Sequence, residues 1–372
     1  MRSEDLRYYI AIDMIPGIGS INAKKLIAYC GGAEAVFKEK KANLLKIPGI
    51  GDLLAKSIAQ QKVLERAEKE VTFIERFSIS AYVYVEKNYP ERLKACEDGP
   101  VVFFLKGEVD LNARKIMAVV GTRSATDYGK TTCEQILSDL VSEGHSPLVV
   151  SGLAFGIDIC AHRAALKHGL KTVAVLGHSL DTIYPSEHRN TAKEIMSNGA
   201  LVSDFPSETK ADRQNFIKRN RIIAGLSDLT LVVESGSKGG ALITADIANS
   251  YSRDVAAVPG RVGDKYSEGC NEMIRTNKAA LVGSAKDISQ LMGWTSETDV
   301  VKHPVQPVLF VELTKEEQQL VELLGNQEKE NLDTLAIKAQ MPVSKVSGLL
   351  LNLEFSGIVK SFPGKLYGLV RR

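Results

Sequence analysis

The sequence lacks the cysteine patterns of a disulfide-stapled domain and of a zinc site. Its five cysteines are an odd number, show no CxxC spacing and are scattered along 372 residues. We therefore expect a reducing compartment, with no structural metal and no other cofactor. The cysteines are Cys30, Cys96, Cys133, Cys160 and Cys270.

The sequence also lacks a long hydrophobic run. No apolar stretch approaches the roughly 18 residues that a membrane span needs. The first residues, MRSEDLRYY, are too polar for a signal peptide. These absences predict a cytoplasmic protein with no membrane partner.

A strong charge of one sign is missing as well. The net charge is only +2, although 25% of the residues are charged. Any binding of nucleic acid must therefore come from local clusters of lysine and arginine, because the molecule as a whole has no strong field. The length and the 44% hydrophobic content predict two or three ordinary domains.

A short repeat marks the first part of the chain. IPGIG occurs at 15–19 and again at 47–51, each time followed closely by an alanine and a lysine. Each copy fits two helices joined by a Pro-Gly hairpin, so residues 1–79 predict a helix-hairpin-helix (SAM-like) helical domain. Such glycines turn backbone N–H groups toward a phosphate, and a role in packing alone is the alternative. The candidate contacts to a duplex backbone are Gly17, Gly19, Gly49 and Gly51.

From about residue 80, apolar strands alternate with amphipathic helices. This rhythm predicts an α/β domain over 80–294, an extended Rossmann-like doubly wound parallel sheet. Five of the six candidate strands end on glycine or serine, which leaves room for a ligand at the carboxyl edge of the sheet. The candidates are 115–121, 147–152, 172–177, 200–205, 229–235 and 254–260.

The last part of the chain predicts a separate small domain. Residues 295–310 lose periodicity and contain two prolines, as a linker does. Helical patterns at 314–325, 331–340 and 343–356, followed by a short hairpin, predict a C-terminal winged-helix domain over 311–372. Its eight basic and eight acidic residues cancel, which argues against strong DNA binding by this domain.

The loop after the first candidate strand, GTRSATDYG, predicts an anion site. Gly121 frees the backbone, Thr122 offers a hydroxyl and Arg123 brings a fixed cation. An ordinary loop with an exposed arginine is the alternative. A P-loop is excluded because seven residues separate Gly121 from Gly129, where that motif needs four.

The second candidate strand ends in SGLAFGID, residues 151–158. Ser151 offers a polar group there and Gly152 permits a close approach of the backbone, while Asp158 is expected to orient its neighbours. The dinucleotide fingerprint GxGxxG is absent, so the glycines do not indicate a nicotinamide or flavin cofactor.

Residues 210–221 are the densest basic stretch of the sheet domain, with five basic residues against Asp212. On a helix, Lys218 and Arg221 share a face and Arg219 projects to one side of it. A solvated helix face is the alternative, and Phe216 fits either the core or a platform for a base. The candidate binding residues here are Lys218, Arg219, Asn220 and Arg221.

The fifth candidate strand leads into SGSKGGALITAD, which places glycines before another helix. Lys238, Gly239 and Gly240 therefore predict a helix N-terminus with open N–H groups and a cation beside it. Close packing of helix on sheet is the alternative. Several such helix ends around one crevice fit successive phosphates of a strand.

No set of catalytic residues is recognisable. The six histidines follow neither HExxH spacing nor the pattern of a triad, and there is no nucleophile elbow. We therefore expect no catalytic residue and no enzymatic activity.

In these segments the chain resembles the DNA-processing protein A (DprA/Smf) family. The matching segments are GTR at 121–123, SGLAFGID at 151–158, AVLGHSLDTIYP at 174–185, FIKRNRIIAGLS at 216–227, GGALITA at 239–245 and AVPG at 257–260. The resemblance implies sequence-independent binding of single-stranded DNA, protection of incoming DNA in natural transformation, loading of RecA recombinase and dimerisation through the core. It also implies that Arg123 is the pocket arginine.

The chain departs from the family at two loops. Gly177, His178 and Ser179 stand where the family usually has a glycine-rich turn, and Lys278 stands where a glycine is usual. Two rival hypotheses stay open. One is a nucleotide phosphoribohydrolase on the same fold, although GGALITAD spaces its residues differently from GGxGTxxE. The other is an adaptor whose two IPGIG hairpins alone contact duplex DNA.

Overall fold

The computed structural model describes residues 3–60, 63–295, 313–325, 329–362 and 366–369. The chain forms two compact units, Met1–Asp299 and Val300–Arg372. Within the described residues no helix is both long and apolar enough to cross a membrane. Most of the predicted linker, 296–310, lies outside the described residues, and the division near residue 80 stays a prediction.

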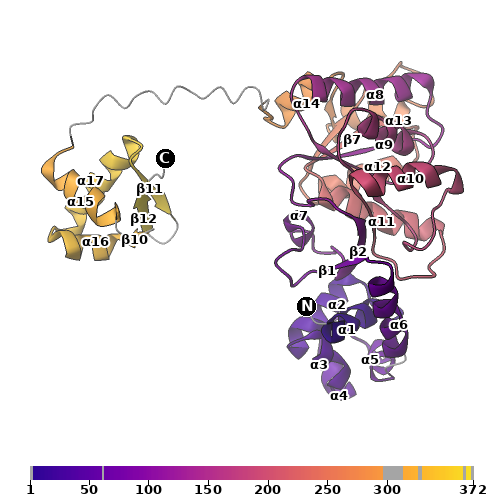
Figure 1. Cartoon of the computed structure of the whole chain (residues 1–372), viewed down its shortest axis with the longest axis horizontal. Helices are drawn as coiled ribbons and strands as arrows, with labels where there is room; N and C mark the ends of the chain where they lie inside the picture. The colour runs from indigo at the N-terminus through magenta and orange to yellow at the C-terminus, as the bar shows by residue number, and fades with distance from the viewer. Residues whose placement is uncertain (1–2, 61–62, 296–312, 326–328, 363–365, 370–372) are drawn as a thin grey trace. The chain divides into compact units, whose positions relative to one another are not determined.

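The first part of the larger unit is helical and lies beside β1 and β2 at one end of this unit (Figure 1). Both IPGIG segments form tight turns between helices, with Gly17 at φ 84° and Gly49 at φ 90°. Glycine suits both positions because it alone adopts a left-handed φ without strain. The helices are α1 (Ser3–Asp13), α2 (Ser20–Cys30), α3 (Ala33–Lys38), α4 (Lys41–Leu44), α5 (Asp52–Ala59) and α6 (Val63–Arg76).

A nine-stranded sheet forms the centre of the larger unit, in the order β1-β2-β6-β5-β4-β3-β7-β8-β9. Strands β3 to β9 are parallel to one another, while β1 and β2 pair antiparallel at one edge. The bounds are β1 (Ser80–Val83), β2 (Val102–Gly107), β3 (Ile116–Gly121), β4 (Leu148–Ser151), β5 (Thr172–Val175), β6 (Ala200–Ser203), β7 (Leu229–Glu234), β8 (Asp254–Ala257) and β9 (Ala280–Leu281). The predicted doubly wound sheet is confirmed.

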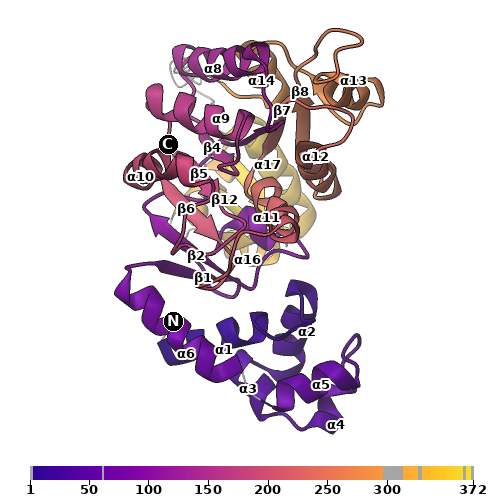
Figure 2. The same ribbon diagram turned by 90° about the vertical axis from the view of Figure 1, so that its right-hand side faces the viewer.

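Helices cover both faces of the sheet (Figure 2). Alternate residues of β3 point to opposite faces: Met117 and Val119 pack with α8 and α9, while Ala118 and Val120 pack with α11 and α12. Burial on both faces explains the continuous apolar runs of the strands. The helical elements are α7 (Glu91–Lys94), α8 (Asp127–Ser142), α9 (Ile157–Lys167), η1 (Ser186–His188), α10 (Arg189–Asn198), α11 (Arg213–Leu226), α12 (Gly240–Ser250), α13 (Glu268–Arg275) and α14 (Ala285–Leu291).

The chain winds in two directions from β3. It passes through β4, β5 and β6 on one side, and then returns to form β7, β8 and β9 on the other side. The carboxyl ends of β3 and β7 therefore lie at the point where the winding reverses, which is where open α/β sheets bind ligands.

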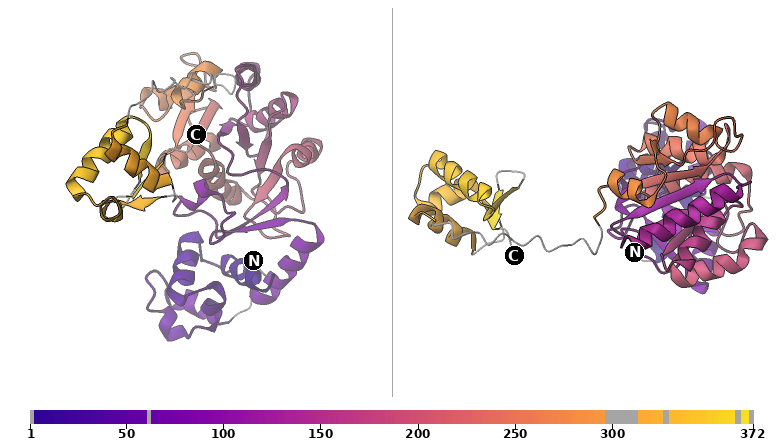
Figure 3. Two further views of the ribbon diagram at one scale, coloured as in Figure 1. Left: turned by 60° about the vertical axis from the view of Figure 1, so that its left-hand side comes forward. Right: turned by 90° about the horizontal axis from the view of Figure 1, so that it is seen from above.

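The smaller unit has the predicted winged-helix architecture (Figure 3). Three helices pack around a core that includes Leu320, Leu335 and Leu350, beside a three-stranded antiparallel sheet of order β10-β12-β11. The turn between β11 and β12 lies outside the described residues. The bounds are α15 (Lys315–Gly325), β10 (Glu330–Asn331), α16 (Leu332–Ala339), α17 (Val343–Phe355), β11 (Val359–Phe362) and β12 (Leu366–Leu369).

Candidate nucleic-acid interface

A cleft of about 800 Å³ opens where the winding of the sheet reverses. Its walls are the loop after β3, the loop after β7, one side of α11 and the first turns of α12. The sequence prediction that the carboxyl ends of the strands share a site is consistent with this position.

The loop after β3 is held in place by Glu234 at the end of β7. The Glu234 carboxylate accepts hydrogen bonds from the backbone N–H of Thr126 (2.8 Å) and from its hydroxyl (2.6 Å), and Thr126 in turn caps the N-terminus of α8. The backbone N–H of Thr122 donates to the Glu234 carbonyl at 2.7 Å. Gly121 and Thr122 therefore line the cleft, but the Thr122 amide already has a partner.

Gly156 fixes the position of the loop from the other side. Its φ is 78°, and a Cβ added there would lie 2.1 Å from the Thr122 carbonyl oxygen and 2.7 Å from the Arg123 carbonyl carbon. Only glycine permits this approach. The loop that carries Arg123 is thus held between Gly156 on one side and Glu234, at the end of β7, on the other.

Arg123 is exposed and lines the cleft. Its guanidinium carbon lies 5.4 Å from the centre of the Phe216 ring, which is within the range of a cation–π contact. Among the described residues its side chain has no hydrogen bond or ion pair, so its charge is available to a ligand.

The start of α12 forms another wall of the cleft, as predicted. Lys238, Gly239 and Gly240 are all exposed there and line the cleft. Gly239 is the N-cap and offers no side chain to the helix, so the first N–H groups of α12 have no acceptor within the helix. Open amides beside a lysine favour an anion.

Arg213 is a cleft residue that the sequence analysis did not select. It is the first residue of α11, is exposed and lines the cleft. The neighbouring Asp212 accepts from the backbone N–H of Gln214 at 2.8 Å, so its carboxylate serves as the N-cap of α11. The signal for Arg213 was its place in the dense basic stretch 210–221, where the predicted binding residues lie at the end of the stretch and Arg213 lies near its start.

Arg219 lies beneath the cleft, and its burial corrects the prediction that it contacts a phosphate. Only 3% of the residue is exposed, and its guanidinium donates to the carbonyls of Gly152 (2.8 Å) and Val175. Burial lowers the pKa of Arg219 to about 10. The side chain therefore ties together the ends of β4 and β5 through its Nη1 atom, while its Nε atom is buried without a hydrogen-bond partner among the described residues.

Lys218 and Arg221 share a face of α11 as predicted, but that face is turned away from the cleft toward the helical part. Arg221 is buried and pairs with Asp204 at 2.5 Å, and it also donates to the carbonyl of Asp98. Lys218 is exposed, lies 5.2 Å from the centre of the Phe205 ring and influences the pKa of Asp13. The reason is tertiary packing, because Arg221 contacts Ser20 of the helical part at 3.4 Å.

Ser151, Gly152 and Asn220 are also buried, contrary to the expected direct contacts. The Ser151 hydroxyl donates to the Val119 carbonyl at 2.6 Å, and the Asn220 amide lies 3.3 Å from the Gly240 carbonyl. A Cβ on Gly152 would lie 2.6 Å from the guanidinium nitrogens of Arg219. These three residues are packed within the protein, and among them only Asn220 lines the cleft.

The four hairpin glycines lie elsewhere, in the helical part, and all are exposed. A Cβ on Gly17 would meet Leu54, and a Cβ on Gly49 would meet Asn22, at 3.2 and 3.1 Å. Since these pairs are equivalent positions of the repeat, the two hairpins pack against each other symmetrically. Their contact with duplex DNA stays a prediction.

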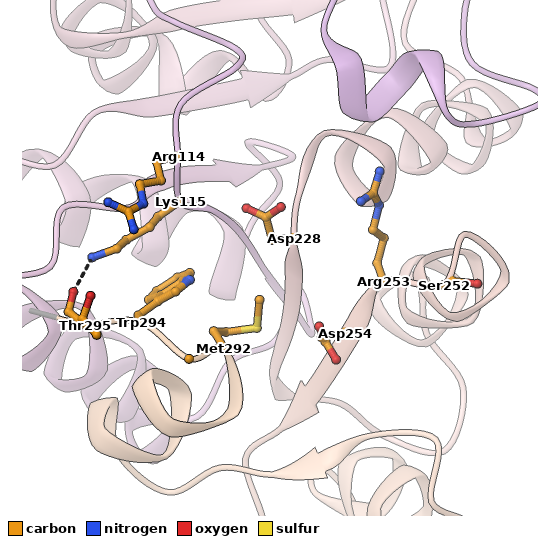
Figure 4. Close-up of a pocket in the computed structure, with 10 residues that line it drawn as sticks. Arg114, Lys115, Asp228, Ser252, Arg253, Asp254, Met292, Trp294 and Thr295 are labelled. Carbon is orange, nitrogen blue, oxygen red and sulfur yellow. Dashed lines mark hydrogen bonds between the residues drawn. The ribbon is translucent and has the colours of Figure 1, made fainter. Parts of the chain in front are cut away.

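A second pocket, of about 380 Å³, lies at the opposite edge of the sheet (Figure 4). Three of its charged side chains, those of Lys115, Asp228 and Arg253, have partners in the protein. Lys115 donates to the Thr295 carbonyl at 3.2 Å and lies over the Trp294 ring, and Asp228 pairs with Arg92 at 2.6 Å. These contacts join segments that lie far apart in the chain.

The carboxylates near the cleft are also engaged. Asp158 is buried, and burial raises the pKa of its carboxyl, opposed by the charge of Arg219. Asp246 pairs with Lys278 at 3.0 Å. In the described ranges no group of three or more histidine, cysteine, aspartate or glutamate residues is arranged to hold a metal ion.

Comparison with known proteins gives consistent matches. The family model of DNA recombination-mediator protein A matches residues 80–293, and the DprA winged helix domain matches residues 309–365. The chain is 29% identical to Protein Smf of Synechocystis over 406 residues, covering 99% of both chains.

Two solved structures are similar. The DNA processing protein A of Streptococcus pneumoniae superposes with a TM-score of 0.66 at 31% identity, covering 76% of this chain and 97% of that one. That of Helicobacter pylori, described with its single-stranded DNA binding mode, gives a TM-score of 0.52 at 27% identity and covers 58% of this chain and 96% of that one.

Proposed function

The chain belongs to the DNA recombination-mediator protein A family, and from this premise we propose that its cleft binds single-stranded DNA without regard to base sequence. The observation that carries the proposal is one arrangement of side chains. Arg123, Arg213 and Lys238 are exposed cations without ion-pair partners among the described residues, and they line the same cleft as the open N-terminus of α12.

This arrangement suits a polyanion. Three unpaired cations and a helix N-terminus offer separate positions to successive phosphates, and none of them reads a base edge. The phosphate contacts therefore give affinity without sequence preference. Gly239 and Gly240 leave room for the backbone of the strand to approach, and Gly121 and Thr122 line the cleft with them.

Phe216 favours a single strand over a duplex. Its ring lies in the cleft beside Arg123. An aromatic ring stacks on a base only if that base is free of its neighbours, as in single-stranded DNA, and such stacking tolerates any base. Of the two interpretations of Phe216 left open by the sequence, we therefore adopt the platform for a base.

The wider role follows from the family resemblance. We propose that the bound strand is incoming DNA, that the protein protects it in the cytoplasm and transfers it to RecA recombinase, and that two copies pair through the sheet domain. The similarity to the DNA processing protein DprA of Streptococcus pneumoniae and that of Bacillus subtilis supports this role.

We propose further that the protein carries out no covalent chemistry. The rival phosphoribohydrolase needs a free catalytic carboxylate, whereas Asp246 is paired with Lys278 and Glu234 holds Thr126. Incubation with nucleoside monophosphates separates the two hypotheses, because release of free base at enzymatic turnover would contradict our proposal.

Fluorescence anisotropy with labelled oligonucleotides tests the binding proposal. We expect the full-length protein to bind single strands of mixed sequence more tightly than the matching duplex, with an affinity that falls steeply with salt. Tighter binding of the duplex would instead favour the adaptor in which the IPGIG hairpins alone contact DNA.

A further inference from the structure

An exposed aromatic ring lies beside the half-buried Phe216, on the loop that leads from β5 to η1. Tyr184 is 50% exposed. The centres of the Tyr184 and Phe216 rings are 5.8 Å apart, and the ring planes are inclined by 34°. Large aromatic side chains with this exposure are frequent at binding surfaces, because part of each ring is available to a partner.

The backbone of Tyr184 is held by a buried histidine. His178 is fully buried, and its Nδ1 lies 2.9 Å from the Ser179 carbonyl oxygen, to which it donates. The backbone N–H of Tyr184 donates to His178 Nε2 at 3.3 Å. These two bonds assign the tautomer that carries the proton on Nδ1.

The same loop is fastened to its surroundings by two serines. The Ser203 hydroxyl donates to the His178 carbonyl at 2.6 Å, the Ser179 hydroxyl donates to the Asp181 carboxylate, and the Ser179 backbone N–H donates to the Thr209 carbonyl at 3.2 Å. Both serines are buried. An exposed ring on a loop with a buried polar scaffold is pre-organised, so little conformational entropy is lost when a ligand stacks on it.

Gly177 places the two rings together. It follows the end of β5, and a Cβ added there would lie 2.5 Å from Phe216 Cδ1. Phe216 therefore packs directly on the backbone that leads into the Tyr184 loop.

We propose that Tyr184 is a second base-stacking position, occupied by a base next to the one on Phe216, and that His178 is its positioning residue. The inference rests on the proposed binding of single-stranded DNA in the cleft. Because the two ring planes are inclined, the two bases leave the parallel stacking of a duplex. The strand thus extends from the cations of the cleft across Phe216 to the loop after β5.

The test compares Tyr184→Leu with Tyr184→Phe in the full-length protein, using oligonucleotides of about 6 and about 15 nucleotides, which bracket common site sizes. The Leu variant should bind the longer strand about 5-fold to 100-fold more weakly, as expected for a lost stacking contact. Its salt dependence should stay unchanged, because no phosphate contact is removed. The Phe variant keeps the ring and should bind like the parent protein.

The role of His178 is tested by measuring base stacking at single positions of the strand, which a general loss of stability would not change at one position alone. An oligonucleotide with a single 2-aminopurine, placed at each position in turn, reports stacking by loss of fluorescence. His178→Gly should abolish the quenching at one position while the neighbouring position on Phe216 stays quenched, and His178→Asn, which keeps a hydrogen-bonding side chain, should restore part of it.

The outcomes separate this inference from the proposed function. If Arg123→Ala leaves all binding unchanged, the proposed function fails. If Arg123→Ala weakens binding but Tyr184→Leu binds the longer strand as tightly as the parent, with the same 2-aminopurine pattern, the second stacking position is overturned. Thermal unfolding of each variant confirms that it is folded.

Discussion

Replacement of Arg123 tests the electrostatic reasoning most directly. Its side chain is exposed, has no ion pair among the described residues and lies 5.4 Å from the centre of the Phe216 ring. Arg123→Ala removes both the charge and the contact with the ring. Arg123→Lys keeps the charge but loses the planar group that stacks on an aromatic face.

The two variants have different expected signatures. Loss of one phosphate contact should flatten the slope of log affinity against log salt by about 0.7 for a single strand. That corresponds to about a fivefold smaller loss of affinity over a tenfold rise in salt. Arg123→Lys should keep the slope. Its free energy of unfolding should fall by about 0.5–1 kcal/mol, the usual contribution of an exposed cation–π contact.

The assay is anisotropy with a labelled single strand, repeated over a tenfold range of salt. Lys193→Ala is the matched control, because Lys193 is an exposed cation on α10 outside the cleft. An Arg123→Ala protein with the slope of the parent protein would refute a phosphate contact at this position. A flattened slope in the control would show that the effect is not specific to the cleft.

Four further outcomes are expected. In the same titration Arg213→Ala should flatten the slope by about 0.7, whereas Lys218→Ala should not, because Lys218 faces the helical part. Gly156→Ala should lower the free energy of unfolding by about 1–3 kcal/mol and weaken DNA binding, since its Cβ would meet the loop of Arg123; unchanged urea unfolding would contradict the close approach. Arg221→Ala should cost about 3–5 kcal/mol in urea unfolding by stranding its buried carboxylate partner, and a loss below about 1 kcal/mol would disprove that pairing. Burial lowers the pKa of His162 to about 3, below its value in the unfolded chain. The free energy of unfolding should therefore be highest above about pH 6.5 and fall by about 1.4 kcal/mol per pH unit below it. The difference in this free energy between pH 7 and pH 5 should be smaller in His162→Gln.

Much of the fold could be predicted from the sequence because its strands are marked twice, by apolar runs and by the small residues that end them. All six candidate strands exist, from β3 to β8. Strands β1 and β2 were not among the six, since their antiparallel pairing interrupts the alternation of strand and helix. The repeated IPGIG likewise predicted the hairpin turns, because the first glycine of each copy, Gly17 or Gly49, adopts the positive φ of a tight turn.

The direction of side chains on α11 could not be predicted in the same way. Helical spacing correctly put Lys218 and Arg221 on one face, but it carries no information about which part of the protein lies next to that face. The burial of Arg219 depends on two carbonyl groups at the ends of β4 and β5, far from it in the chain. Phe216 was ambiguous for the same reason, because a phenylalanine in a basic helix fits both a core and a surface.

The reversal of winding at β3 has a mechanical consequence. Among the described strands, the β3–β7 ladder joins the part of the sheet built before residue 204 to the part built after residue 228. A polymer that bridges Arg123 and Lys238 crosses the β3–β7 ladder and links the two halves of the sheet from outside. Separating the two halves of the sheet by force should therefore require more force when the polymer is bound, because it bridges the strands β3 and β7 at which the halves are joined.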